Sequence, residues 1–537
     1  MTPTGRHRSA APTGVAGILA LILIVGIIGL AFAGLMIAGG TSGFGGSWGY
    51  IRRLVLVSLG QAALSTLLSL ILGAALALAL ARRERFPGRS LMIAAMNVAT
   101  VLPPIVAVFA IVAVFGRSGW LGDLTASVGL DLGSWLYGLP GILIAHVFFN
   151  APLAARSFLA ALASVTPEHW RLASHLGLPP ATIFRIIDRP VLLREAPGIA
   201  GIVFLLCFTS FAVVLALGGG PNVSTLEVAI FEALRFEAEF ARAAILALLQ
   251  IVICLALLLP IGTLARRPQQ TVSSGVIFRR TDRDIRSLRI LDAFILLAGA
   301  ALIMPPLLAI LFRGIAGIPA LVDPNVTRAI WTSLAIGIPA GLIGTALALA
   351  LADLSRRLRI GAAAPRAADA VGLVAIMILV VSPMALSAGL FIMLRPVINP
   401  LSVGLPLIVL VNALMALPFA YRQIEPPLTL AAERYGSLAD SLGIGGMTRV
   451  RLVDWPLLRR PLIVAIAIAI ALSLGDLGVA SFFGTGDLVT LPVLIHRLLG
   501  TYRMEEAASV SLLLSLLVLG LFLAAQSWSG DWIARAR

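Results

Sequence analysis

The chain has 537 residues, of which 59% are hydrophobic and 12% are charged, with a mean hydropathy of +1.02. A soluble domain carries about 25% charged residues, so this composition excludes a soluble globular protein. The net charge of +15 comes entirely from arginines that cluster on one side of the predicted membrane spans. This pattern favours a topology signal over a nucleic-acid-binding surface.

Twelve apolar runs are long enough to cross a bilayer, which needs about 20 residues of helix. Since helices satisfy their backbone polar groups internally, we expect an all-α polytopic membrane protein, whereas the short alternating segments of a β-barrel are absent. The runs of the first half are 14–40, 54–81, 90–115, 138–162, 196–217 and 241–261. Those of the second half are 288–312, 329–352, 368–394, 402–424, 461–484 and 507–526.

The arginines predict the orientation of these spans. Thirty of the 40 lie in the two termini and in the loops on one side of the predicted spans. Short cytoplasmic loops carry an excess of arginine and lysine, so this side is predicted to be cytoplasmic, with both termini on it. Each half holds six spans, an even number, and the two halves therefore have the same orientation.

Internal repetition supports a division into two parallel repeats. "GAALALALA" at 73–81 matches "GTALALALA" at 344–352. We predict a first transmembrane repeat at 1–261, a basic cytoplasmic linker at 262–287 and a second transmembrane repeat at 288–537. Parallel repeats of this kind place a transport pathway at their interface.

A polar loop also occurs twice, at an offset of 266 positions. It reads "HLGLPPATIFRIIDRP" at 175–190 and "SLGIGGMTRVRLVDWP" at 441–456. Thr166 and Pro167 are suited to begin a helix, and Gly177 and Gly443 are suited to end one in a left-handed turn. Each loop is therefore predicted to be a helix, a glycine turn and a second short helix at the cytoplasmic face. The alternative is a pair of ordinary polar turns.

The spacing Ala-x3-Gly-x9-hydrophobic-x2-Pro in both loops resembles the coupling loop of ABC-importer permeases. In that family the loop docks in a cleft of the ATP-binding subunit. The family motif opens Glu-Ala-Ala, and here the expected acid is missing from both copies. The resemblance implies that loop 1 (166–190) couples through Arg171, Leu172, Ala173, Gly177, Ile187, Asp188 and Pro190, and loop 2 (432–456) through Ser437, Leu438, Ala439, Gly443, Val453, Asp454 and Pro456.

No catalytic motif is visible in the sequence. The chain has no lysine, and so no G-x4-G-K-[ST] loop to hold the phosphates of ATP. Its five histidines have no metal-ligand spacing. We predict that the chain is not an enzyme, binds no cofactor or metal, and relies on ATP bound to a partner subunit.

Asp476 is the clearest ionisable residue within a predicted span, where a charge is costly and marks a functional candidate. Gly475 beside it suggests a local break in the helix. Phe211, which follows Ser210, is its counterpart in the first repeat. A carboxylate opposite an aromatic ring suits an organic cation. The alternative is that Asp476 caps a broken helix or pairs with an arginine such as Arg497.

Segments 208–244 and 474–508 are similar to the thiamine/thiamine pyrophosphate permeases, which are fused two-repeat members of the ABC-importer class. The resemblance implies a thiamine-like cationic substrate, two copies of a cytoplasmic ATP-binding subunit, a periplasmic substrate-binding protein and a place in the bacterial inner membrane. It leaves open free thiamine or its phosphates as substrate. A permease for iron(III) or another small solute, and an ion-coupled secondary transporter, are the alternatives.

Overall fold

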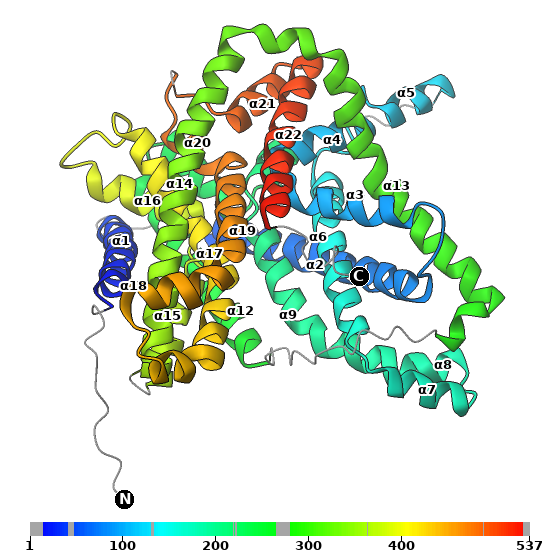
Figure 1. Ribbon diagram of the computed structural model, residues 1–537. Coiled ribbons are helices and arrows are strands. Elements are labelled where there is room, and N and C mark those ends of the chain that lie inside the picture. The colour runs from blue at the N-terminus through cyan, green and yellow to red at the C-terminus, as the bar shows by residue number, and fades with distance from the viewer. Residues whose placement is uncertain are drawn as a thin grey trace, which may run out of the picture.

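A computed structural model describes residues 14–40, 48–129, 134–218, 220, 223–264, 280–361, 364–486 and 488–529 (Figure 1). Every regular element in these residues is a helix. Eleven helical segments are long and apolar enough to cross a membrane. The predicted all-α polytopic membrane fold is therefore confirmed, with eleven such segments in place of the expected twelve.

The helices of the first half are α1 (Val15–Gly40), α2 (Trp48–Arg82), α3 (Arg89–Val101), α4 (Pro104–Phe115), α5 (Trp120–Ser127), α6 (Leu139–Ala163), α7 (Pro167–His175), α8 (Pro180–Ile183), η1 (Phe184–Asp188), α9 (Arg189–Phe208), α10 (Ala212–Leu217), α11 (Leu226–Arg235) and α12 (Phe240–Leu264). Those of the second half are η3 (Thr281–Asp284), α13 (Arg286–Ala316), η4 (Ile318–Val322), α14 (Pro324–Arg356), η5 (Arg357–Gly361), α15 (Pro365–Met377), α16 (Pro383–Leu394), α17 (Gly404–Ser441), α18 (Gly446–Arg449), η6 (Val450–Asp454), α19 (Trp455–Leu474), α20 (Gly478–Phe483), α21 (Leu491–Gly500) and α22 (Met504–Ser529).

The predicted span 368–394 is two helices, α15 and α16, instead of one. Ser382 ends the interruption between them as the N-cap of α16, because its hydroxyl accepts a hydrogen bond of 3.0 Å from the Ala385 N–H. Pro383 follows at the first helical position and disfavours helical backbone at the residue before it. The same effect divides the predicted span 90–115 at Leu102 and Pro103 into α3 and α4.

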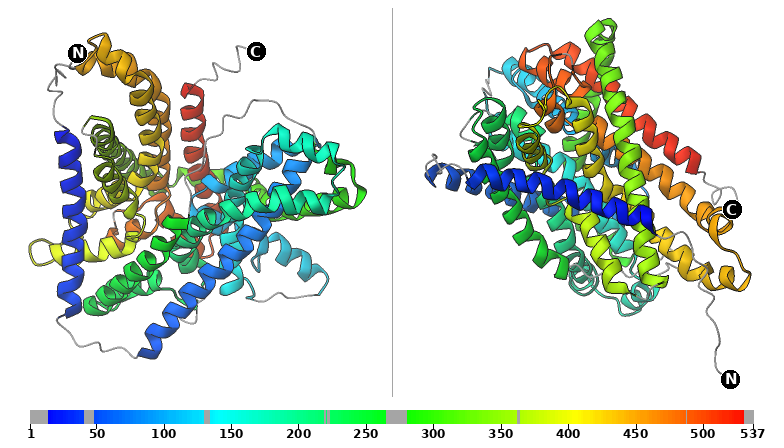
Figure 2. Two further views of the ribbon diagram at one scale, coloured as in Figure 1. Left: turned by 90° about the horizontal axis from the view of Figure 1, so that it is seen from below. Right: turned by 90° about the vertical axis from the view of Figure 1, so that its left-hand side faces the viewer.

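The two halves repeat one packing arrangement. In the first half α2, α6 and α9 pack against one another, and α14, α17 and α19 do so in the second. The first helix of each half crosses to the other half: α1 packs on α14 and α16, and α13 packs on α2 and α4. Figure 2 shows α1 lying across the second half in two views. The predicted boundaries of the two repeats stay a prediction, and residues 265–279 of the predicted linker lie outside the described residues.

Glycines allow the crossing of α1 over α16. A Cβ atom added to Gly34 would lie 2.5 Å from the Gly389 carbonyl oxygen, and one added to Gly389 would lie 2.3 Å from that of Ala31. No side chain fits at these distances, so the two backbones touch directly. Close backbone contact at small residues is the usual way in which helices associate within a bilayer.

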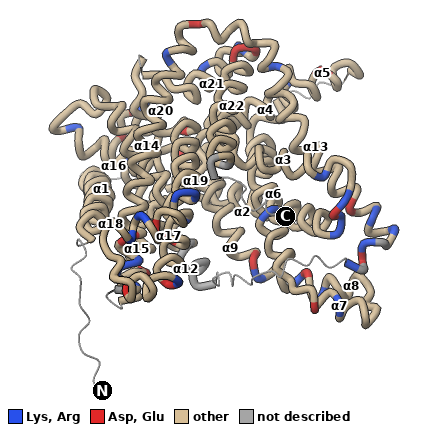
Figure 3. Tube along the Cα trace, in the orientation of Figure 1, with Lys and Arg blue, Asp and Glu red and all other residues tan. Residues whose placement is uncertain are grey.

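Charged residues gather at the ends of the molecule, and its middle is almost free of them (Figure 3). In the right-hand view of Figure 2, the last turns of α22 and the orange segment that holds α18 lie at the same end. This distribution is that of a protein whose middle lies in hydrocarbon.

Candidate coupling surface and translocation pathway

Loop 1 folds around a small hydrophobic core of its own. Ala173 on α7 is buried with Trp170, and Ile183 and Ile187 close the core from the second short helix. Gly177 provides the turn between the two helices with a φ of 57°, and the Leu178 N–H donates to the Ala173 carbonyl at 3.1 Å. The alanine, glycine and hydrophobic positions of the motif therefore form one packed helical hairpin.

Loop 2 has the same glycine turn, but the helix that precedes this turn differs from that of loop 1. Gly443 has a φ of 66°, and the Ile444 N–H donates to the Ala439 carbonyl at 2.8 Å. The preceding helix is continuous with the span, because α17 runs for 38 residues from the membrane into the loop. Gly436 stands where loop 1 has Trp170, and the Arg449 guanidinium lies near it. Both loops then form a five-residue π-helical turn that ends at Asp188 or Asp454.

The two loops present the same apolar face to their surroundings. Leu172 and Leu438 are 59% and 55% exposed, Leu176 and Leu442 are 63% and 64% exposed, and Ile186 and Leu452 are 57% and 59% exposed. Members of each pair are 266 positions apart. Arg171, Ser437, Pro190 and Pro456 are exposed too, whereas Ala439 and the two aspartates are buried and Val453 is half-buried. Large apolar side chains held outward on a polar loop mark an interaction surface.

Asp188 is tied to the segment that enters the second half. Arg280 donates to its two carboxylate oxygens at 3.1 and 2.7 Å. The same guanidinium binds Asp282 at 2.9 Å and stacks over the Trp170 ring at 4.3 Å from its centroid. Since both members of the Asp188–Arg280 pair are buried, loop 1 is fastened to residues 280–282.

Asp454 is tied instead to the end of α14. Arg356 donates to both oxygens of Asp454 at 3.1 Å, and it also binds Asp353 at 2.5 Å. Arg357 joins Asp353 at 2.6 Å. Loop 2 is therefore fastened to a transmembrane helix of its own half, which differs from the attachment of loop 1.

A third buried ion pair joins the two halves directly. Arg82, the last residue of α2, donates to Asp292 of α13 at 2.6 Å, and the neighbouring Arg83 donates to the second carboxylate oxygen at 2.9 Å. The side chains of Arg82 and Asp292 are 7% and 1% exposed. This carboxylate therefore holds two arginines of the first half against the second half.

Four interruptions of the helices meet between the two halves. They lie at Pro103 before α4, at Thr209–Phe211 after α9, at Ser382 before α16 and at Gly475–Leu477 after α19. A Cβ atom added to Gly475 would lie 3.1 Å from that of Pro103. One added to Gly478 would lie 3.3 Å from the Phe211 ring and 3.5 Å from the Met384 side chain. Broken helices of this kind build the substrate sites of many transporters.

Asp476 caps the short helix that follows its break. Its carboxylate oxygens accept hydrogen bonds from the N–H groups of Val479 at 3.4 Å and Ala480 at 3.1 Å. A helix-capping role was one of the two alternatives predicted for Asp476. The other was an ion pair with Arg497, and within the described part of the chain no such pair forms. The side chain is partly exposed. Its role with a substrate stays a prediction.

Phe211 packs on Gly478, two residues beyond Asp476 in the chain. An acid and a ring that face each other across a substrate stay a prediction. The Phe211 ring also contacts Phe231 edge to face, with centroids 5.1 Å apart. Ser210 and Gly475 belong to the two helix breaks themselves, and Ser210 is partly exposed. The four predicted pathway residues are therefore gathered at one place.

Sequence reasoning missed a buried acid at the same place. Glu227 on α11 accepts a hydrogen bond from Gln250 and lies within hydrogen-bonding reach of the Ser382 hydroxyl and the Met384 N–H. Burial raises the pKa of the Glu227 carboxyl to about 7, and these hydrogen bonds act in the opposite direction. An acid of the first half thus meets the positive end of α16 in the second. The sequence signal that could have identified Glu227 is the repeat itself, because "TLEVAI" has this acid where the matching "TLPVLI" of the second half has Pro492.

Membrane-spanning helices in two similar halves, with broken helices between them and paired loops outside, define a transport permease. No family model matches the chain. It is 38% identical over 531 residues to a thiamine transport system permease protein of Brucella melitensis, covering 98% of this chain and 97% of that one. It is 39% identical over 521 residues to the Escherichia coli protein of the same name, covering 95% of each chain. The chain belongs to the family of thiamine transport system permease proteins, which are fused permeases of ABC importers.

A more distant similarity covers one part of the chain. A sulfate transport system permease protein of Synechocystis sp. is 29% identical over 206 residues, which are 36% of this chain and 70% of that protein. The resemblance stated from the sequence to ABC-importer permeases is confirmed by the full-length relatives.

Proposed function

We propose that the chain is the transmembrane subunit of a binding-protein-dependent importer that moves thiamine and its phosphates across the bacterial inner membrane. The observation that carries the proposal is the 38% identity over 98% of the chain to a thiamine permease. Both termini and both loops lie in the cytoplasm in this proposal, in agreement with the excess of arginine on that side. A periplasmic substrate-binding protein delivers the substrate at the opposite face.

Two copies of an ATP-binding subunit dock on the chain, one on each loop. Loops 1 and 2 present matched apolar faces, so one partner cleft fits both. ATP is hydrolysed on that partner, because the chain has no lysine for a phosphate-binding loop. The buried pairs Asp188–Arg280 and Asp454–Arg356 then pass the movement of the loops to the helices.

Uptake into proteoliposomes tests this function. Vesicles that hold the chain, its ATP-binding subunit and its binding protein are expected to accumulate labelled thiamine only when ATP is present at the cytoplasmic face. Thiamine diphosphate and iron(III) serve as competing solutes. Accumulation that follows a proton gradient without the ATP-binding subunit would establish a secondary transporter instead. ATP-driven import of iron(III) alone would support an ABC importer and contradict thiamine as its substrate.

Asp476→Asn is expected to lower the rate of thiamine uptake about ten-fold at limiting substrate, because a charged contact worth about 1.5 kcal/mol is lost. The amide oxygen of asparagine still caps α20, so thermal stability is expected to stay unchanged. Asp323→Asn is the matched control, since Asp323 caps α14 through the Asn325 N–H at 2.8 Å far from the helix breaks. Equal uptake by both variants would leave Asp476 with a purely structural role.

A further inference from the structure

An apolar groove of about 340 Å³ runs between α3, α13 and α22. Almost all of its lining is aliphatic, and Ser515 is the one polar residue in it. Several of the lining side chains are exposed at the surface of the protein, including Leu91 (62%), Leu308 (42%), Leu311 (43%) and Leu516 (57%). Since α13 and α22 are membrane-spanning segments, this groove opens to the hydrocarbon of the bilayer.

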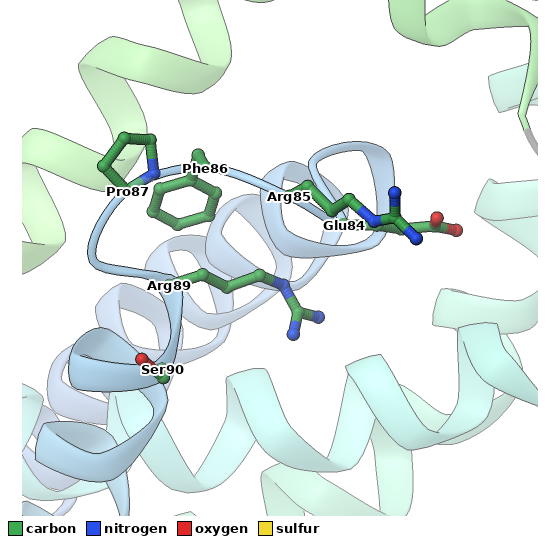
Figure 4. A pocket seen from close by; sticks show the side chains of 6 residues that line it. All are labelled: Glu84, Arg85, Phe86, Pro87, Arg89 and Ser90. Carbon is green, nitrogen blue, oxygen red and sulfur yellow. The ribbon is translucent and has the colours of Figure 1, made fainter.

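A basic hollow of about 580 Å³ lies at one end of this groove, in the loop between α2 and α3. Figure 4 shows its lining side chains, with the side chains of Arg85 and Arg89 extending to the same side and Phe86 and Pro87 at the opposite part of the loop. Glu84 also lines the hollow. Arginines at the end of a membrane-spanning helix are typical of a protein surface at the level of lipid headgroups.

The two arginines have charge available for a ligand. The neighbouring Arg83 is engaged by Asp292 and by the Arg283 carbonyl. Arg89 donates only its Nε–H, to the Arg83 carbonyl at 3.3 Å, which leaves its two terminal nitrogens unengaged. Within the described part of the chain, no carboxylate forms an ion pair with Arg85 or Arg89. The hollow is therefore electropositive.

The hollow and the groove follow one another along α3. Arg89 and Ser90 line the hollow, and Leu91, the next residue, begins the groove. The groove ends at Leu102, beside Pro103, which contacts Gly475 at the helix breaks. A molecule with a negative headgroup and an apolar chain matches both parts of this surface.

We propose that an anionic phospholipid binds at this surface, with its phosphate at Arg85 and Arg89 and one acyl chain in the groove between α3, α13 and α22. Basic pockets between transmembrane helices at the cytoplasmic side are suited to such headgroups. The inference rests on the membrane topology of the proposed function and is independent of the transported solute. The lipid chain supports the wall formed by α3 and α4 next to the helix breaks.

Native mass spectrometry of the delipidated transporter complex, titrated with phosphatidylglycerol or phosphatidylcholine, tests the proposal. The double variant Arg85→Gln/Arg89→Gln is expected to bind phosphatidylglycerol roughly thirty-fold more weakly, which corresponds to about 1 kcal/mol for each arginine. Ala94→Trp, which fills the groove, is expected to weaken binding with both arginines in place. Arg286→Gln/Arg289→Gln removes two exposed arginines at the start of α13 and is the control of equal charge.

Three results would overturn the proposal. They are equal affinity of phosphatidylglycerol for the Arg85/Arg89 variant and the control, equal binding of phosphatidylcholine, and full displacement of the lipid by inorganic phosphate. The last result would indicate a site for a free phosphate ion. A complex that imports no thiamine but binds phosphatidylglycerol as expected would reject the proposed substrate and retain the lipid site.

Discussion

The double variant Gly177→Pro/Gly443→Pro is expected to lose ATP-dependent uptake entirely, with a decrease of at least a hundred-fold to the background of empty vesicles. Both glycines have a positive φ, of 57° and 66°, at the turn of a loop. Proline is restricted to a φ near −65° and has no N–H, so it cannot form either turn. The exposed leucines of each loop would then no longer face a common partner, and ATP hydrolysis would be uncoupled from the helices.

Gly177→Asn/Gly443→Asn is the matched control, since asparagine tolerates the left-handed conformation better than other residues with a side chain. A Cβ atom added at either glycine meets nothing within 4 Å, so the new side chain has space. This variant is expected to retain most of the uptake. Uptake by the proline variant at the level of the asparagine variant would refute the coupling role of the two loops. Membrane insertion of each variant is checked by quantitative immunoblotting of the vesicles.

Asp292→Ala is expected to cause the largest loss of stability, about 3–5 kcal/mol, because it leaves Arg82 buried without a counter-charge. It also removes the partner of Arg83, and both contacts join the two halves. We expect the midpoint of thermal unfolding of the solubilised protein to fall by about 3–5 °C. Scanning fluorimetry in a fixed detergent measures this change.

Two further variants separate the charge effect from general damage. Glu506→Ala removes the half-buried partner of the exposed Arg503 and is expected to cost no more than about 1 kcal/mol. Arg82→Met/Asp292→Leu replaces the buried pair by apolar side chains and is expected to regain most of the lost stability. If Asp292→Ala unfolded at the same temperature as the unmodified chain, the Arg82–Asp292 ion pair would not stabilise the contact between the two halves.

The loops differ in what they are fastened to, and this difference has a consequence for transport. Loop 1 is bound to Arg280 in the predicted linker that precedes the second half, whereas loop 2 is bound to α14 of its own half through Arg356. Two identical partner subunits would therefore move two different parts of the fused chain. The exposed apolar faces of the two loops are therefore similar, whereas the buried ion pairs of Asp188 and Asp454 are different.

Much of this protein follows from its sequence because its patterns are local. Apolar runs of about 20 residues predict membrane spans independently of tertiary contacts, because the thickness of the hydrocarbon core sets their length and composition. The alanine, glycine and proline positions of loops 1 and 2 predict a helical turn because the left-handed glycine conformation depends on a single residue. The near-full-length identity to thiamine permeases supports the same conclusion that the quoted segments suggested.

The sequence by itself therefore determined the class of fold, the two similar loops and the family. Only the tertiary structure decided that the span 368–394 is broken at Ser382, that α1 and α13 cross to the opposite halves, and that Asp188 and Asp454 have different arginine partners. The crossings and the arginine partners depend on residues that are far apart in the chain, whereas the break at Ser382 follows from a local proline whose effect on a helix has more than one outcome. A proline can kink a helix or end it, and a buried aspartate can pair with any arginine that the packing brings near, so local patterns leave these outcomes open.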